Sequence, residues 1–102
     1  MKYPKYIELK GFLSFFILHE LKNAALSGDE LALIIGKRKG STLNSGTIYP
    51  ALKRLKKLKL LSYSRDGRRK VYSLTKEGHR ELSGLYVLFG NVFFGLKGRL
   101  KR

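Results

Sequence analysis

Residues 41–82 constrain the fold more than any other part of the chain. Their sequence, STLNSGTIYPALKRLKKLKLLSYSRDGRRKVYSLTKEGHREL, contains a helical pattern, two short strands and the start of another helix, in that order. Apolar residues recur every three to four positions in the first part, and Tyr, Val, Leu and Ser dominate the strands. A basic helix followed by a basic hairpin predicts a winged helix-turn-helix, an α+β fold that is mostly helical.

The helix of this segment is expected to be amphipathic and to end near Leu58. Its apolar stripe consists of Ile48, Ala51, Leu52, Leu55 and Leu58. The opposite face carries Tyr49, Pro50, Lys53 and Lys57. If Thr47 is the N-cap, Pro50 lies in the first turn, where its missing amide costs nothing. If Asn44 is the N-cap, Pro50 lies deeper and would kink the helix.

The strands are expected at residues 60–65 and 68–74. Asp66-Gly67 between them predicts a type I′ turn, which needs positive φ at both central positions. Thr75 is typical of an N-cap and predicts a last helix. The apolar positions of that helix are Leu82, Leu85, Tyr86, Phe89, Val92, Phe93 and Leu96.

Two helices are expected before this segment. Residues 7–26 are apolar around most of a helix, which predicts a position at the centre of the fold. Ser27 and Glu30 have the spacing of a capping box, which starts a second helix that ends near residues 36–40. A chain of 102 residues is expected to form one domain, with a core at 7–78, a C-terminal helix at 79–96 and a frayed basic tail at 97–102.

The charge distribution points to a polyanionic partner. The net charge is +15, and 12 Lys and Arg fall between residues 37 and 70, opposed there only by Asp66. Such a field attracts nucleic acid first and anionic membrane surfaces second. The longest run without a charge, 82–96, has 15 residues, whereas a membrane span needs about 20, so we expect no span.

The residues expected to contact double-stranded DNA lie at the end of the second helix, along the third helix and on the hairpin. They are Lys37, Arg38, Lys39, Thr42, Asn44, Ser45, Thr47, Tyr49, Lys53, Lys57, Arg65, Arg68, Arg69 and Lys70. The third helix can enter a major groove with its N-terminal end, and the hairpin tip can follow the adjacent backbone. Alternatively, Lys53 and Lys57 form an ordinary solvated face, and Tyr49 packs against the hairpin.

The last helix is expected to be the interface of a homodimer. Its apolar positions exceed what one small domain can cover, because the first helix is itself apolar. A small-molecule effector, if there is one, is expected among the same aromatic side chains.

The motif GTIYPALKRLKKLKLL, followed by a basic hairpin and SLTKEGHREL, resembles the PadR family of winged-helix regulators. The resemblance covers residues 7–96 and includes Tyr72, Leu74-Thr75 and Gly78. It implies a winged helix-turn-helix, a dimer built through terminal helices, and transcriptional repression. We expect such a protein in the cytoplasm, at the nucleoid. The chain departs from the family pattern at Ser45, where Pro is usual, at Lys59, where Gly usually ends the helix, and at Asp29, where Tyr is usual.

The sequence argues against an enzyme. There is no Cys, and His19 and His79 are too isolated to hold a metal, so we expect no metal and no cofactor. Paired carboxylates and phosphate loops are absent from the sequence. Two other functions stay open: an architectural nucleoid-type protein with little sequence preference, and a module that recruits a protein partner through its last helix.

Overall fold

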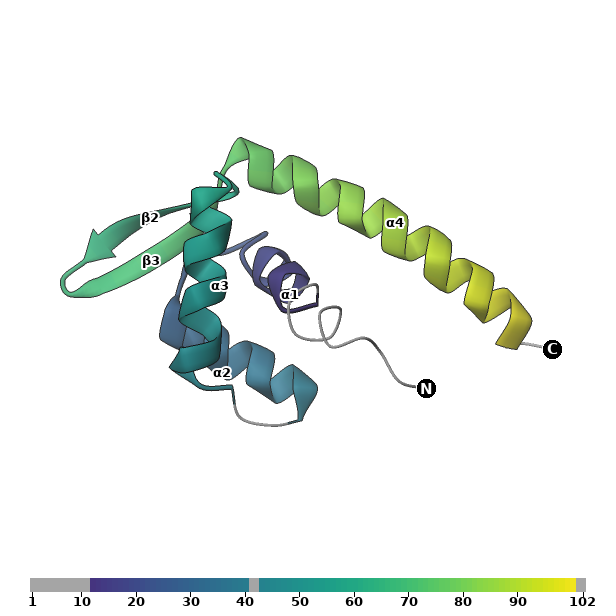
Figure 1. The fold of residues 1–102 in the computed structure, drawn as a ribbon, viewed down its shortest axis with the longest axis horizontal. Helices are drawn as coiled ribbons and strands as arrows, with labels where there is room; N and C mark the ends of the chain where they lie inside the picture. The colour runs from purple at the N-terminus through teal and green to yellow at the C-terminus, as the bar shows by residue number, and fades with distance from the viewer. Residues whose placement is uncertain (1–11, 41–42, 101–102) are drawn as a thin grey trace.

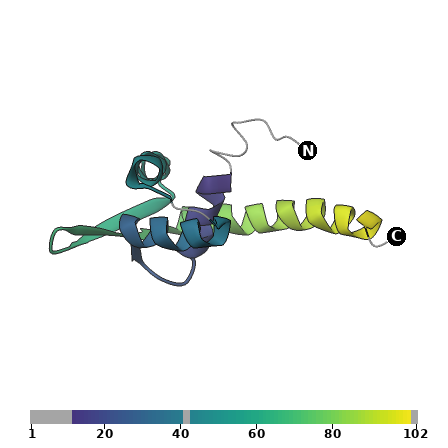
Figure 2. The same cartoon turned by 90° about the horizontal axis from the view of Figure 1, so that it is seen from below.

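The computed structural model describes residues 12–40 and 43–100, without the side chains of Lys39, Ser45 and residues 92–100. The elements are α1 (Phe12–Glu20), β1 (Leu26–Ser27), α2 (Gly28–Lys39), α3 (Ser45–Lys57), β2 (Leu61–Asp66), β3 (Arg69–Leu74) and α4 (Lys76–Leu100). The strands form one antiparallel sheet in the order β1-β3-β2. This is the predicted winged helix-turn-helix: α2 and α3 form the helix pair, and β2 and β3 form the wing. The wing and α4 leave the helical body in opposite directions (Figures 1 and 2).

The first helix is shorter than predicted at its C-terminal end. Residues 7–11 of the predicted helix lie outside the described part of the chain, and α1 ends at Glu20 rather than near Leu26. Leu26 and Ser27 instead form β1, where they pair with Tyr72 and Val71 of β3. Hydrogen bonding to the sheet therefore replaces the last helical turns that the apolar pattern alone predicted.

The capping box at the start of α2 is confirmed. The hydroxyl of Ser27 accepts a hydrogen bond from the Glu30 amide at 3.2 Å, and Glu30 Oε1 accepts one from the Ser27 amide at 2.8 Å. At the other end, Gly40 adopts a left-handed conformation with φ of 72°, which ends the helix without a steric penalty.

Asn44, rather than Thr47, is the N-cap of α3. Its Oδ1 accepts a hydrogen bond from the Thr47 amide at 3.1 Å, so Pro50 lies inside the helix. Proline has no amide hydrogen, so the carbonyl of Gly46 lacks its usual partner four residues along. The predicted apolar stripe is buried except at Leu58, which is 60% exposed because it follows the helix as its C-cap.

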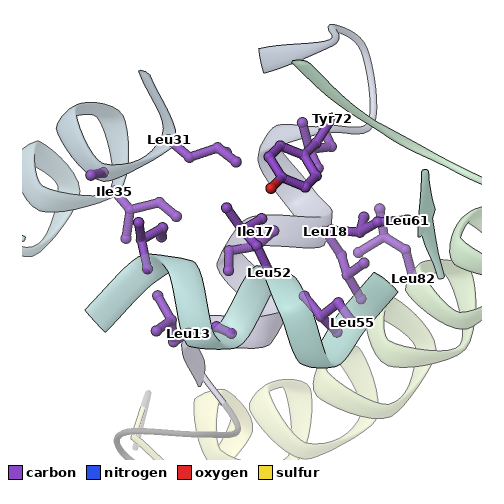
Figure 3. Close-up of a cluster of buried hydrophobic side chains, with 14 residues drawn as sticks. Leu13, Ile17, Leu18, Leu31, Ile35, Leu52, Leu55, Leu61, Tyr72 and Leu82 are labelled. Carbon is purple, nitrogen blue, oxygen red and sulfur yellow. The ribbon is translucent and has the colours of Figure 1, made fainter. Parts of the chain in front are cut away.

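Side chains from every helix converge on the stripe of α3 (Figure 3). The core residues are Leu13, Ile17, Leu18, Leu21, Leu31, Ala32, Ile35, Ile48, Ala51, Leu52, Leu55, Leu61, Tyr72 and Leu82. Ile48 and Leu52 have no exposed surface. Since the stripe is held from several sides, the rotation of α3 about its own axis is fixed.

The turn of the wing differs from the prediction by one residue. Asp66 pairs with Arg69, which makes Gly67 and Arg68 the two central residues. Gly67 has φ of 66°, whereas Arg68 is not among the described residues with positive φ. Positive φ at the first central position alone is the pattern of type II′, for which Gly is preferred at that position.

Thr75 and Gly78 join the end of α3, the start of β2 and the start of α4. The hydroxyl of Thr75 donates to the carbonyl of Lys59 at 2.7 Å and accepts from the amide of Gly78 at 3.0 Å, as the predicted N-cap should. The amide of Thr75 donates to the carbonyl of Leu60 at 3.1 Å. A Cβ at Gly78 would stand 2.2 Å from that carbonyl oxygen, so only glycine fits.

The last helix is longer than predicted. It starts at Lys76 and continues to Leu100, so the first four residues of the expected basic tail are helical. Within the part of the chain that the structure describes, no helix has the length and apolar character needed to cross a membrane.

Lys59 follows α3 with φ of 67°, where Gly is usual in the resembled family. A side chain in this left-handed region costs about 1 kcal/mol or more. We expect Lys59→Gly to raise the free energy of unfolding by about 1 kcal/mol in urea titrations. The matched control is Lys53→Gly within α3, which should lower it by about 1 kcal/mol. Equal shifts in one direction would contradict strain at Lys59.

Candidate nucleic-acid interface

The exposed face of α3 carries the predicted cations. Lys53 and Lys57 are exposed, because the stripe on the other side of the helix is buried. Asn44 and Thr47 are also exposed at the helix start, but they bind each other: Asn44 Oδ1 accepts from the Thr47 amide and, at 3.3 Å, from its hydroxyl. This cap uses only the side-chain oxygen of Asn44. The hydrogens on its side-chain nitrogen can therefore bind a phosphate or a base edge.

The side chain of Tyr49 makes more contacts within the chain than its position on this face predicts. It is 39% exposed, and its hydroxyl donates a hydrogen bond of 3.3 Å to Oδ1 of Asp29 in α2. Burial raises the pKa of the Tyr49 hydroxyl above its usual value, and Asp29 raises it further. Tyr49 thus packs mainly against the start of α2, and it lines a recess that it shares with the wing.

The register of the wing divides its basic residues between two faces. Arg65 lies opposite Lys70, on the same face as the pair Tyr63 and Tyr72. Arg69 lies on the other face, where its Nη2 is 3.9 Å from Oε1 of Glu30. Arg68 is at the turn. The wing therefore presents Arg65 and Lys70 on the sheet face that carries the tyrosines, while Arg69 is paired with α2.

A groove of about 410 Å³ separates α3 from the wing. It is lined by Tyr49, Leu52, Lys53, Lys56, Tyr63, Lys70 and Tyr72. The ammonium groups of Lys56 and Lys70 stand 5.2 and 4.8 Å from the centre of the Tyr63 ring, within the range of cation–π attraction. Lys56 and Tyr63 were not among the predicted contacts, and the alternation of side chains along β2 was the available signal for Tyr63.

One of the predicted cations at the basic end of α2 makes an ion pair within the chain. Arg38 forms an ion pair with Glu20 of α1, which directs its guanidinium toward the helical body. Lys37 is exposed. The side chains of Lys39 and Ser45, and all of Thr42, lie outside the described part of the chain.

Some of the α4 residues predicted to form the dimer interface pack within the chain itself. Leu82 is 2% exposed and belongs to the core, which corrects its assignment to an interface. Leu85, Tyr86 and Phe89 are half-buried, and the Phe15 ring of α1 stands 4.8 Å from that of Phe89. The side chains of Val92, Phe93 and Leu96 are not described. Val87 and Leu88, which the prediction omitted, are 64% and 55% exposed.

The aromatic side chains of α1 and α4 enclose a second recess, of about 390 Å³. Its lining residues are Phe12, Phe15, Phe16, Tyr86, Phe89 and Gly90. His19 of α1 contacts one of these lining residues, because its Nδ1 is hydrogen-bonded to the Tyr86 hydroxyl at 2.6 Å. Among the described residues there is no group of three His, Cys, Asp or Glu side chains placed to hold a metal ion.

Comparison with known proteins gives a consistent result. The family model described as "Transcriptional regulator PadR-like family" matches residues 17–84. A PadR family transcription regulator from Clostridium difficile R20291 is 31% identical, with a TM-score of 0.75 over 88% of this chain and 99% of that one. A PadR-like transcription factor from Bacteroides fragilis is 28% identical, with a TM-score of 0.81 over 91% and 94%.

The matching structures include one that was solved with operator DNA. Bacillus subtilis PadR, solved in complex with operator DNA, is 26% identical, with a TM-score of 0.65 over 74% of this chain and 46% of that one. No curated protein matches the sequence.

Proposed function

Because this chain belongs to the PadR-like family of transcriptional regulators, we propose that it binds double-stranded DNA at specific sequences and represses transcription as a homodimer. Members of this family are transcription regulators rather than enzymes, which agrees with the expectation from the sequence. Repression would follow from occupancy of promoter DNA. A regulator of this kind acts where the chromosome lies, so we place it in the cytoplasm, at the nucleoid.

The exposed face of α3 is the observation that carries this proposal. The buried stripe turns Lys53 and Lys57 outward, and the wing adds Arg65 and Lys70 across a groove. Duplex DNA carries two phosphates per base pair, so a helix in the major groove and a wing on the backbone would both meet negative charge. The complex of Bacillus subtilis PadR with operator DNA supports double-stranded DNA as the partner.

The homodimer is proposed from the surface of α4. Gly84, Val87, Leu88 and Asn91 share one face of the helix, at spacings of three and four residues. Val87 and Leu88 are exposed, and a Cβ at Gly84 would meet no atom within 4 Å in the described part of the chain. Burying the two apolar side chains is worth roughly 1.5–3 kcal/mol each before the entropy of association. A two-fold dimer would also place two α3 helices about 34 Å apart, one turn of DNA.

An architectural nucleoid-type role is the second candidate, and the net charge of +15 favours it. Selection of bound fragments from random DNA, followed by titration of selected and random duplexes, separates the two functions. A specific regulator should bind its selected duplex at least about 10³-fold more tightly. Similar affinity for both duplexes would favour the architectural role.

The double variant Lys53→Ala with Lys57→Ala should bind duplex DNA more weakly. If each side chain meets a phosphate, the slope of log K against log salt should fall by about 0.9 per contact in each protomer. The control variant, Lys76→Ala with Arg80→Ala, removes two exposed cations from the start of α4. Equal losses in both variants would mean that net charge, and not the α3 face, drives binding.

The wing should supply affinity more than specificity. Phosphate contacts carry little sequence information, so Arg68→Gln with Arg69→Gln should weaken selected and random duplexes by similar factors. Fluorescence anisotropy titrations at one salt concentration measure the affinity for each of the two duplexes. A loss confined to the selected duplex would show instead that the wing reads bases.

Val87→Glu with Leu88→Glu should convert the dimer into a folded monomer, because both side chains are exposed in the single chain. Sedimentation at micromolar concentration is the measurement, and Leu33→Glu, on the exposed side of α2, is the control that should remain dimeric. Phe89→Glu with Phe93→Glu should also give monomer, but with loss of stability, because Phe89 packs against α1. If the wild-type protein sediments as a monomer at this concentration, the proposed homodimer is wrong.

A further inference from the structure

Asp29 and Tyr49 come from different helices, and their side chains meet beside the wing. The Tyr49 hydroxyl donates to Oδ1 of Asp29 at 3.3 Å. Both residues line a recess of about 300 Å³ that also contains Arg68, Arg69 and Lys70. Among the described residues that line it, Asp29 is the only carboxylate. A negative charge placed among three cations weakens any surface whose sole task is to hold phosphate.

The Tyr49 side chain is held in position by close packing. A Cβ at Gly28 would stand 2.6 Å from Cε1 and Cζ of the Tyr49 ring and 2.7 Å from its hydroxyl. Gly28 is the first residue of α2, and Ser27 before it is fixed by both hydrogen bonds of the capping box. The ring therefore rests on the backbone at the start of α2, and the pair is formed before any ligand arrives.

The hydrogen bond determines what this pair offers to a ligand. The phenol has one hydrogen, which it donates to Asp29, so its outward side presents lone pairs. A tyrosine is already protonated at neutral pH, and burial and the nearby carboxylate raise the pKa of Tyr49 further, so the phenol keeps this hydrogen. An ionised carboxylate presents only acceptors as well. Together the two side chains form a surface that accepts hydrogen bonds and does not donate them.

A phosphate oxygen is also only an acceptor, so this pair offers it no hydrogen bond, whereas a hydrogen-bond donor would be held by the pair. In the major groove, the donors on base edges are the amino groups N6 of adenine and N4 of cytosine. We propose that Asp29 and Tyr49 form an acceptor pair that reads the exocyclic amino group of one adenine or cytosine and so determines sequence preference.

This assignment rests on the proposed binding of DNA through α3. It gives different residues of the interface different roles. Lys53, Lys57 and the wing hold the backbone without reading sequence. The acceptor pair contributes discrimination, because guanine O6 or thymine O4 at the same position would place one acceptor against another. Replacement of the preferred base should lower affinity roughly tenfold per half-site.

The test uses a duplex that wild-type protein selects from random DNA. At each adenine or cytosine in turn, the base is replaced by purine or 2-pyrimidinone, the analogues that lack the amino group. Wild type should lose roughly tenfold in affinity at one position of each half-site. Tyr49→Phe, which keeps the ring on Gly28, and Asp29→Ala should both bind the analogue and the parent duplex within about twofold of each other.

Glu81→Ala, which removes one exposed carboxylate from α4, controls for net charge and should keep the sensitivity of wild type. The proposal is overturned if Asp29→Ala tightens selected and random duplexes equally and keeps the sensitivity, since Asp29 would then only repel phosphate. It is also overturned if no amino group matters to wild type. If wild type binds the selected duplex no better than random DNA, the proposed sequence-specific function fails with it.

Discussion

The burial of one side of α3 is the constraint on which the rest of the structure depends. Ile48 and Leu52 are fully enclosed by side chains from the other helices and the sheet, so α3 cannot rotate about its axis without exposing them. This rotation decides that Lys53 and Lys57 face solvent. The charge of the interface is therefore positioned by apolar contacts on the opposite side of the same helix. A substitution in the stripe would therefore disturb the proposed DNA binding without changing a basic residue.

Hydrogen bonds around Thr75 hold the wing and α4 in place relative to α3. The Thr75 hydroxyl and amide bind the carbonyls of Lys59 and Leu60, which connect α3 to the wing, while the hydroxyl also caps α4 through Gly78. The Gly78 backbone lies so close to Leu60 that a methyl group would not fit. The helix α3, the wing and the start of α4 thus meet at these backbone and hydroxyl hydrogen bonds, which limits how far any of them can move alone.

Local signals in the sequence were sufficient to predict the elements, but not their contacts. Caps at Ser27 and Thr75 and the stripe of α3 follow from spacing within a few residues, and the structure confirms them. The turn of the wing was placed one residue early, because Asp66-Gly67 is a strong type I′ signal while cross-strand pairing decides the register. Arg38 pairs with Glu20, and Tyr49 pairs with Asp29. The two residues of each pair are about 20 positions apart, and no local pattern in the sequence predicts either contact.

The apolar excess of α4 illustrates the same limit and links dimerisation to DNA binding. The predicted partner surface included Leu82 and Phe89, but Leu82 enters the core and Phe89 packs on α1. Val87 and Leu88, which that prediction omitted, are exposed. In the proposed homodimer, α4 would contact the partner on one side and α1 on another, and α1 also packs against α3. The separation of the two recognition helices would then depend on how α4 lies against α1. In that dimer, the aromatic contact between α1 and α4 would influence the half-site spacing.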